Sequence, residues 1–171
     1  MEEQLIKGCK KNNRQIQKKL YEYFSDEMFR LCYKYTNNVE DSEDILVKAF
    51  LKVFQNIKKF ESREKGSLKK WIKTIMINES LMFLRTKKQL FFEQIDDKIE
   101  NNDENIETEL YSQDILNIVK QMPNGYRTVF NLYSIEGYSH KEISELLSIN
   151  INTSKSQLHK AKKYLQKKIN N

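Results

Sequence analysis

Apolar residues recur at steps of three and four positions along most of the chain, which is the spacing of one face of an α-helix. In the first half this spacing predicts a helix over 16–35 that ends at Asn37. A second helix begins near Asp41, and a third, capped by Ser67, follows a loop over 60–66. The first half is therefore predicted to be one module of amphipathic helices.

The second half carries the pattern of a helix-turn-helix. Ser139 and Glu142 stand three residues apart, the spacing at which each side chain bonds the other residue's backbone N–H in a capping box. The apolar residues of the helix that follows face inward, Ile149 fills the turn, and a second helix begins at about Ile151. This pattern predicts two helices packed across a short turn.

The composition agrees with an all-helical protein. The 171 residues include only 4 Gly and 1 Pro, too few for the frequent turns of a β-sandwich, a barrel or a glycine-looped nucleotide fold. No phosphate-binding glycine motif occurs. A secretory signal and an apolar run of membrane-spanning length are also missing, so we expect a cytoplasmic protein with no membrane insertion. The predicted fold class is all-α, with two small helical domains.

Charge divides the chain into three parts. Residues 1–92 hold 20 basic and 12 acidic side chains, 93–109 hold 1 and 8, and 110–171 hold 9 and 4. The net charges of +8, −7 and +5 predict a first domain over 1–92, an acidic linker over 93–109 and a second domain over 110–171. The total charge of +6 indicates a polyanionic partner.

The acidic linker has only Ile95, Ile99 and Ile106 as large apolar residues. They are too few to offset the entropy of ordering the segment, so we expect it to be flexible. When extended it spans at most about 55 to 60 Å, more than one DNA turn of about 34 Å, so both domains can reach one duplex. The linker is either a solvated spacer or an acidic segment that enters a nucleic-acid channel of a partner.

The sequence holds no evident constellation for catalysis or metal binding. Cys9 and Cys32 are isolated and are interpreted as buried or half-buried thiols. His140 and His159 have no Cys or carboxylate around them at metal-ligand spacing. The acidic cluster over 41–44 stands at a helix start, where capping and the helix dipole explain it. We therefore expect no enzyme activity, no cofactor and no metal.

Two candidate surfaces lie in the first domain. On the second helix, Leu51 stands among charged residues, which indicates either a contact surface or a solvated face with one stray leucine. On the third helix, Lys70 and Lys73 stand beside Trp71 and Asn78. Cations follow phosphates, flat rings stack and an amide reads a base edge, so this set suits single-stranded nucleic acid. Taken alone, a tryptophan such as Trp71 is more often a core residue than a stacking surface.

The second helix of the helix-turn-helix is a third candidate surface. No acidic residue occurs over 151–171. Its predicted exposed side suits a major groove, with the first residues at base edges and lysines on phosphates; the alternative is a structural helical hairpin. The polar donors on that side are Asn152, Thr153, Lys155, Ser156, Gln157, His159, Lys160 and Lys163.

In their order and spacing these segments resemble the extracytoplasmic-function sigma factors, the promoter-recognition subunits of bacterial RNA polymerase. Residues 41–54 are similar to the helix by which region two of the family binds the beta-prime coiled coil. The loop 60–66 resembles the one that captures a flipped minus-ten base, and 70–78 resembles the melting helix. Segments 116–143 and 153–161 are similar to the entry and the recognition helix of region four.

The resemblance implies how the candidate residues divide between partners. Those expected to bind polymerase core are Asp41, Asp44, Lys48, Leu51 and Lys52. Those expected to contact the minus-ten element are Phe60, Arg63, Lys65, Lys70, Trp71, Lys73 and Asn78. The eight donors of the helix-turn-helix are expected to contact the minus-thirty-five duplex.

The resemblance also implies three partners: polymerase core, through its beta-prime coiled coil and beta flap, promoter DNA, and an anti-sigma protein. Three positions depart from the usual residues of the family. Gln157 stands in place of Arg, which weakens the expected phosphate contact, Tyr133 stands where some members have Arg, and Met82 replaces Asp or Asn. The alternative function is a helix-turn-helix regulator that does not bind polymerase core.

Overall fold

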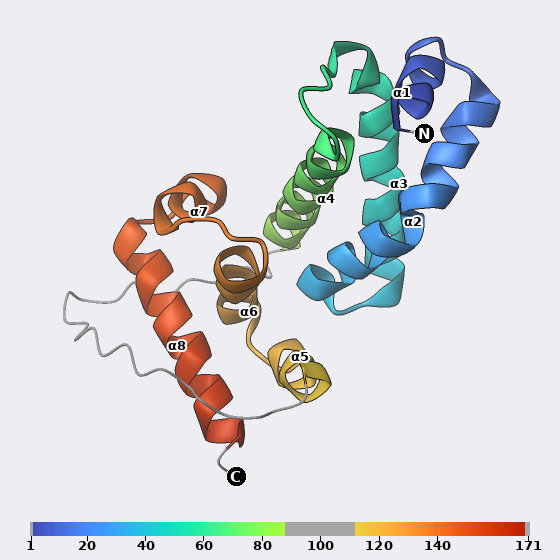
Figure 1. The fold of residues 1–171 in the computed structure, drawn as a ribbon. Helices are drawn as coiled ribbons and strands as arrows, with labels where there is room; N and C mark the ends of the chain where they lie inside the picture. Colours follow the sequence, from blue (N-terminus) through green and yellow to red (C-terminus); the bar gives the residue numbers. More distant parts are fainter. Residues whose placement is uncertain (1, 88–111, 170–171) are drawn as a thin grey trace. The chain divides into compact units, whose positions relative to one another are not determined.

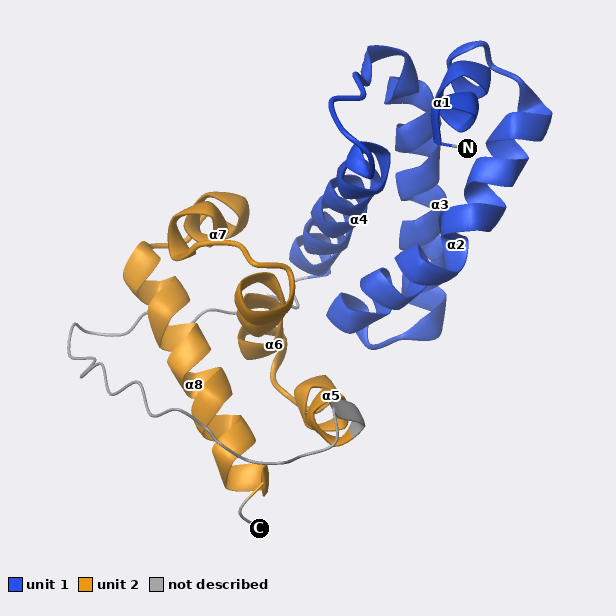
Figure 2. Ribbon diagram, in the orientation of Figure 1, with its two compact units in different colours: residues 1–87 blue, residues 88–171 orange. Residues whose placement is uncertain are grey.

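The computed structural model describes residues 2–87 and 112–169 (Figure 1). All regular secondary structure within these two ranges is helical, which confirms the predicted all-α fold class. The chain divides into two compact units, 1–87 and 88–171 (Figure 2). The predicted linker 93–109 lies outside the described residues, so the predicted domain boundaries stay predictions.

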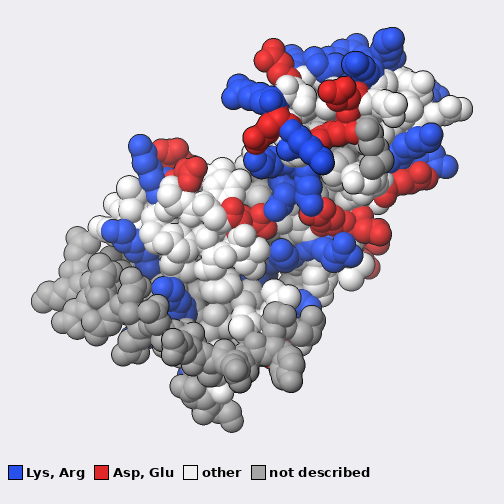
Figure 3. Space-filling view, in the orientation of Figure 1, with Lys and Arg blue, Asp and Glu red and all other residues white. Residues whose placement is uncertain are grey.

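Unit 1 is a bundle of three long helices with a short helix before them. Its elements are α1 (Glu2–Lys10), α2 (Arg14–Thr36), α3 (Val39–Asn56), the 3₁₀ turn η1 (Ile57–Lys59) and α4 (Ser67–Thr86). The three long helices pack on one another pairwise through their apolar faces, which leaves charged side chains of both signs on the surface (Figure 3). Helix α1 was not predicted from the sequence, because two helical turns are too short to show a clear period.

Local caps set the ends of α2. It begins before the predicted start because Asn13 caps it, accepting the backbone N–H of Gln15 at 3.0 Å and of Ile16 at 3.2 Å on Oδ1. Asn37 adopts the left-handed conformation, with φ of 53°, and ends the helix as predicted.

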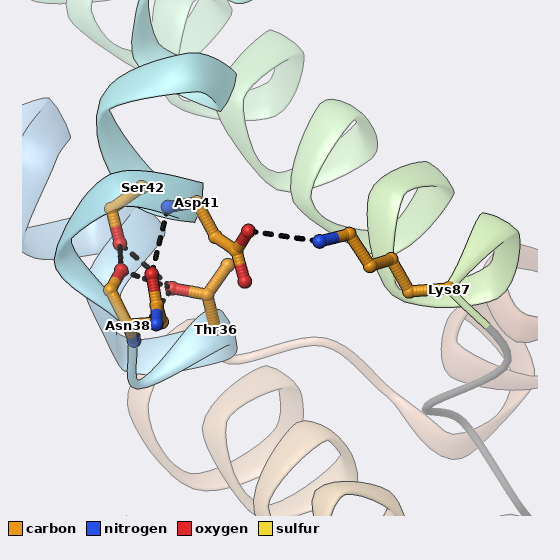
Figure 4. Close-up of polar contacts among 5 residues, drawn as sticks. All are labelled: Thr36, Asn38, Asp41, Ser42 and Lys87. Atoms are coloured by element: carbon orange, nitrogen blue, oxygen red, sulfur yellow. Dashed lines mark hydrogen bonds and ion pairs between the residues drawn. The ribbon is translucent and has the colours of Figure 1, made fainter.

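The turn between α2 and α3 is held by side chains. α3 begins two residues earlier than predicted because Asn38 is its cap, and Asn38 Oδ1 accepts the backbone N–H of Asp41 at 2.9 Å (Figure 4). The hydroxyls of Thr36 and Ser42 lie 2.7 Å apart. Asp41 Oδ1 lies 3.2 Å from Lys87 Nζ, just beyond α4. The start of α3 is thus tied to both neighbouring helices.

The cap of α4 comes from α1, not from Ser67 as predicted. Ser67 is the first residue of the helix, and the capping position is Gly66, which has φ of 85° and no side chain to offer. The backbone N–H groups of Gly66 and Leu68 donate to the Glu2 carboxylate, each at 3.0 Å. A residue distant in sequence therefore supplies the cap.

Both cysteines are buried in unit 1, as predicted. Burial raises the pKa of the Cys32 thiol to about 11 and also raises the pKa of Cys9. Because the thiolate is the reactive form, we expect both side chains to be inert at neutral pH.

Unit 2 packs shorter helices against one long helix. Its elements are α5 (Ser112–Lys120), α6 (Asn124–Phe130), the π-helical turn η2 (Asn131–Ile135), α7 (His140–Leu147) and α8 (Ile151–Ile169). Helices α5, α6 and α7 all contact α8. One buried cluster joins the ends of α5 and α8 through Val119, Met122, Ala161 and Leu165.

Helices α7 and α8 form the predicted helix-turn-helix. The capping box is present: Ser139 Oγ accepts the N–H of Glu142 at 3.3 Å, and Glu142 Oε2 accepts the N–H of Ser139 at 2.8 Å. The hydrogen bonds from Ser139 lower the pKa of Glu142. Ser148 adopts a left-handed conformation, with φ of 55°, and ends α7.

Neither a membrane span nor a metal cluster is found in the parts of the chain that the structure describes. No helix over 2–87 or 112–169 is long and apolar enough to cross a membrane. Within the same ranges, no three His, Cys, Asp or Glu side chains are grouped as metal ligands.

Candidate nucleic-acid interface

The exposed face of α3 combines aliphatic and charged side chains. Val47 and Leu51 are 53% and 55% exposed and lie about one helical turn apart, with Asp44 and Lys48 exposed beside them. Three of the residues predicted to bind polymerase therefore share one surface. Val47 was missed, although its place four residues before Leu51 was visible in the sequence.

The other two predicted polymerase-binding residues form ion pairs with the end of α4 and its interior. Asp41 pairs with Lys87, and Lys52 Nζ lies 2.5 Å from Oε1 of the buried Glu79. These pairs connect residues 46 and 27 positions apart, which no local pattern reveals. Asp41 and Lys52 therefore also hold α3 against α4.

A surface pocket of about 380 Å³ opens between α4 and the end of α3 with η1. Three residues predicted to contact an unpaired strand, Phe60, Trp71 and Asn78, line this one pocket. The rings of Phe60 and Trp71 are in contact, with centroids 4.8 Å apart. Trp71 is half-buried, so it contributes to packing as well as to the pocket.

The pocket also has polar lining residues that the sequence analysis did not assign to it. They are Lys52, Asn56, Lys59 and Glu79. The Lys52–Glu79 pair places a cation and a buried carboxylate there, and Asn56 Nδ2 donates to the carbonyl of Lys52 at 2.8 Å. An aromatic wall beside amides and cations can bind a nucleotide, with the base stacked on the rings and the phosphate near the cations. Lys59 could have been predicted as a pocket residue, because it directly precedes Phe60, which was predicted to contact the minus-ten element.

Further basic residues stand on the loop 60–66 and on α4 (Figure 3). Arg63, Lys65 and Lys70 are exposed, and Lys73 is half-buried. Lys70 Nζ lies 2.7 Å from Glu64 Oε1, which raises the pKa of Lys70 and lowers the pKa of Glu64. An exposed pair of this kind contributes little stability, so a phosphate can replace the carboxylate at low cost.

On α8 six of the eight predicted donors reach the surface at least in part. Asn152 and Lys155 are exposed in the first turns, and Lys163 is exposed further on. Three more are half-buried: Thr153, His159 and Lys160.

The expectation that Ser156 and Gln157 lie on the exposed side of α8 is wrong. Ser156 is 3% exposed and Gln157 is 0% exposed. Ser156 Oγ donates to the carbonyl of Thr153 at 2.9 Å, so its short side chain lies against its own helix. Gln157 follows the buried Ser154 by three residues and precedes the buried Ala161 by four, which places it on the inward stripe. Gln157, which stands where the family usually has Arg, therefore lies in the packed interior of unit 2 and not on the exposed side of α8.

Replacing Gln157 with leucine is expected to stabilise unit 2. Among the described residues, neither polar atom of its buried amide has a hydrogen-bond partner. Because an unpaired buried polar group costs about 1–3 kcal/mol, Gln157→Leu should raise the free energy of unfolding by about 1–2 kcal/mol. Hydrogen exchange of the α8 amides measures this. Gln121→Leu, at an exposed position, is the control and should have no such effect; a loss of stability in Gln157→Leu would contradict the argument.

Tyr133, His140 and Ser154 link η2, α7 and α8. The rings of Tyr133 and His140 stack with centroids 4.5 Å apart, and His140 Nδ1 lies 2.9 Å from Ser154 Oγ. Burial, together with the charges of Lys155 and Lys162, lowers the pKa of His140, which favours the neutral ring. Tyr133 thus supports the helix-turn-helix while remaining 40% exposed.

Comparison with known proteins finds two family matches in the predicted order. Residues 20–89 match Sigma-70 region 2, and residues 112–165 match Sigma-70, region 4. The first match begins in α2 and extends past the end of α4, and the second covers most of unit 2. A regulator that used the helix-turn-helix alone would leave the first match without a role.

Individual relatives agree with these matches. The chain is 28% identical to the ECF RNA polymerase sigma factor SigW of Bacillus subtilis (strain 168), over 96% of this chain and 94% of that protein. Among solved structures, it resembles CnrH in complex with the cytosolic domain of CnrY, with a TM-score of 0.52 and 13% identity over 97% of this chain and 95% of the other. It also resembles the sigma factor RpoE of Bartonella quintana in complex with the anti-sigma factor NepR, with a TM-score of 0.53 and 20% identity over 88% and 94%.

Both regions occur in one chain, in order, on the two helical units that the structure describes. The proteins of this family are non-enzymatic polymerase subunits that bind core polymerase and promoter DNA. The chain therefore belongs to the sigma-70 family, as a sigma factor of the extracytoplasmic-function type that serves RNA polymerase in promoter recognition and transcription initiation.

Proposed function

We propose that the pocket of unit 1 holds one unpaired base of the minus-ten strand. The observation that carries the proposal is the meeting of Phe60, Trp71 and Asn78 in one pocket, since these side chains supply stacking surface and an amide. Unpairing a base costs a few kcal/mol. Stacking contributes about 1–3 kcal/mol per base, and hydrogen bonds from the amide add to it, so capture offsets the cost of opening.

The basic residues around the pocket are proposed to follow the strand backbone. Arg63 and Lys65 extend from the loop 60–66, and Lys70 and Lys73 stand on the first turns of α4. We assign Lys52 to this group in place of the polymerase surface, because it lines the pocket and pairs with Glu79.

The exposed face of α3 is proposed to bind the beta-prime coiled coil of core polymerase. Its aliphatic centre, Val47 and Leu51, is too exposed to serve the core of unit 1. Asp44 and Lys48 beside it can pair with charges on a partner helix. A mixed face of this kind suits a helix of the opposite charge pattern.

Unit 2 is proposed to read the minus-thirty-five duplex with α8 and to contact the beta flap. Asn152 and Thr153 stand in the first turn of α8, where a recognition helix meets base edges. Lys155, Lys160 and Lys163 suit phosphates. His159 remains a predicted contact, whereas the two buried donors of α8 are left out. Because the two units belong to one chain, binding of one unit to the promoter raises the effective concentration of the other unit at its own site.

An anti-sigma protein is proposed as a further partner. The solved RpoE structure that resembles this chain contains the anti-sigma factor NepR. The exposed face of α3 is the surface we propose for it, because a protein bound there excludes core polymerase. Promoter activity in the presence of such a partner would then fall in proportion to the loss of core binding.

Transcription with purified components tests the whole assignment. Core polymerase with this protein is expected to initiate from a promoter that core alone ignores, and the chain should co-purify with core. The promoter is found by selection from a library of random minus-ten and minus-thirty-five elements. Silence across the whole library, with active core in a control reaction, would contradict the proposal.

A further inference from the structure

The short helix α1 contacts both ends of the loop 60–66. At the entry, α1 packs against η1, whose last residue precedes Phe60. At the exit, the Glu2 carboxylate accepts the backbone N–H groups of Gly66 and Leu68. The loop 60–66 runs from Phe60, in one wall of the pocket, to α4, which forms the other wall. Helix α1 therefore holds this loop at both of its ends.

We propose that Glu2 is a positioning residue for minus-ten recognition. It fixes the exit of the loop 60–66 and the first turn of α4, and through them the geometry of the pocket. Glu2 does not line the pocket itself. The inference rests on the function proposed for the pocket, and it adds a residue that neither the motif nor the pocket identifies.

Helix physics explains why α4 depends on this carboxylate. The first N–H groups of a helix have no partner within the helix, and Gly66 has no side chain with which to cap them. A negative charge at this end also interacts favourably with the helix dipole. Trp71 lies in the second turn of the same helix, so fraying of the first turn would loosen one wall of the pocket.

Packing against the rest of unit 1 holds α1 in place. Leu5, Ile6 and Cys9 are buried. Gly8 lies so close to α2 that a Cβ atom added there would come within 2.6 Å of Ile16. The side-chain contacts that the loop makes with α4 are weaker, because the Glu64 pair is exposed. The hydrogen bonds of Glu2 therefore anchor the exit of the loop 60–66 to the well-packed helix α1.

The test uses holoenzyme assembled from core polymerase and the full chain, with any tag at the C-terminus. The probe is a promoter fragment selected by the wild-type holoenzyme, with variants that carry single minus-ten substitutions. Open-complex formation is followed by 2-aminopurine fluorescence, and discrimination is the ratio of rates on the selected and substituted fragments. Glu2→Ala is expected to lower this ratio about fivefold, which is about 1 kcal/mol. Affinity for core should stay unchanged, and the unfolding midpoint should fall by about 4–8 °C, as expected for the loss of one helix cap.

Three further variants show whether a loss of discrimination comes from the hydrogen bonds of Glu2. Glu3→Ala removes an equal charge from an exposed neighbour and should behave as wild type. Glu2→Gln should restore part of the discrimination, because its carbonyl oxygen still accepts one N–H. Asn78→Ala tests the pocket independently of α1.

The possible results separate the two claims. If Asn78→Ala lowers discrimination and Glu2→Ala does not, the role of Glu2 is rejected and the pocket stands. If neither variant changes it, the function proposed for the pocket is wrong. If Glu2→Ala also lowers core affinity about fivefold, Glu2 is a general structural residue and the inference is overturned.

Discussion

Leu51→Asp is expected to weaken the binding of core RNA polymerase by about 10- to 100-fold while leaving unit 1 folded. Burying a leucine side chain contributes about 1.5–3 kcal/mol, and each 1.4 kcal/mol is about a tenfold change in affinity. In the free chain Leu51 is exposed, so its loss removes little from the core of unit 1. Fluorescence anisotropy of the labelled protein titrated with core measures the affinity.

A matched control separates a specific surface from a general effect of added charge. Tyr23→Asp places the same carboxylate on α2 at an exposed aromatic residue, and we expect core affinity to stay within about twofold of wild type. Val47→Ala should give a loss smaller than that of Leu51→Asp. Equal losses for Leu51→Asp and Tyr23→Asp, or a lower unfolding midpoint for Leu51→Asp, would count against the assigned face.

Asn78→Ala is expected to slow promoter opening by about 5- to 100-fold, with core affinity unchanged. An amide that bonds a base edge contributes about 1–3 kcal/mol to recognition, and that energy is available only once the base is unpaired. Asn78 is exposed on α4, and alanine has the higher helix propensity, so the helix itself should not be weakened. Opening is measured by permanganate reactivity of the minus-ten strand.

The control for Asn78 removes an amide elsewhere. Gln15→Ala does so at an exposed position of α2 and should open the promoter at the wild-type rate. The comparison that decides is between opening and core binding in the same variant. If both fall equally in Asn78→Ala, the residue supports the unit as a whole, and the proposed division of labour between α3 and the pocket is incorrect.

The helices were predictable where their signals are local. The apolar spacing located α2, α3, α4 and the helix-turn-helix, because an amphipathic helix repeats its buried face every three or four residues. The capping box of Ser139 and Glu142 was predictable for the same reason. The start of α3 was misplaced because Asn38, rather than Asp41, is its cap. Ser67 has the chemistry of a cap, but Glu2 takes that role from another helix.

The candidate site was predictable in its residue types and not in its geometry. Phe60, Trp71 and Asn78 were identified one by one, but their meeting in one pocket depends on how α4 packs beside η1. The ion pair between Lys52 and Glu79 could not be predicted, because the two residues are distant in the sequence. Gln157 stands four residues before Ala161, so helical spacing placed it on the inward stripe, but its polar amide favoured the exposed side.

The all-helical class, the helix-turn-helix and the family resemblance followed from the amino-acid sequence alone, because they depend on residue chemistry and on spacing within a few turns. The pocket, the capping of α4 by Glu2 and the burial of Gln157 were decided only by tertiary structure. Each of these depends on which helix faces pack together, and that choice brings together residues whose separation in the sequence carries no signal.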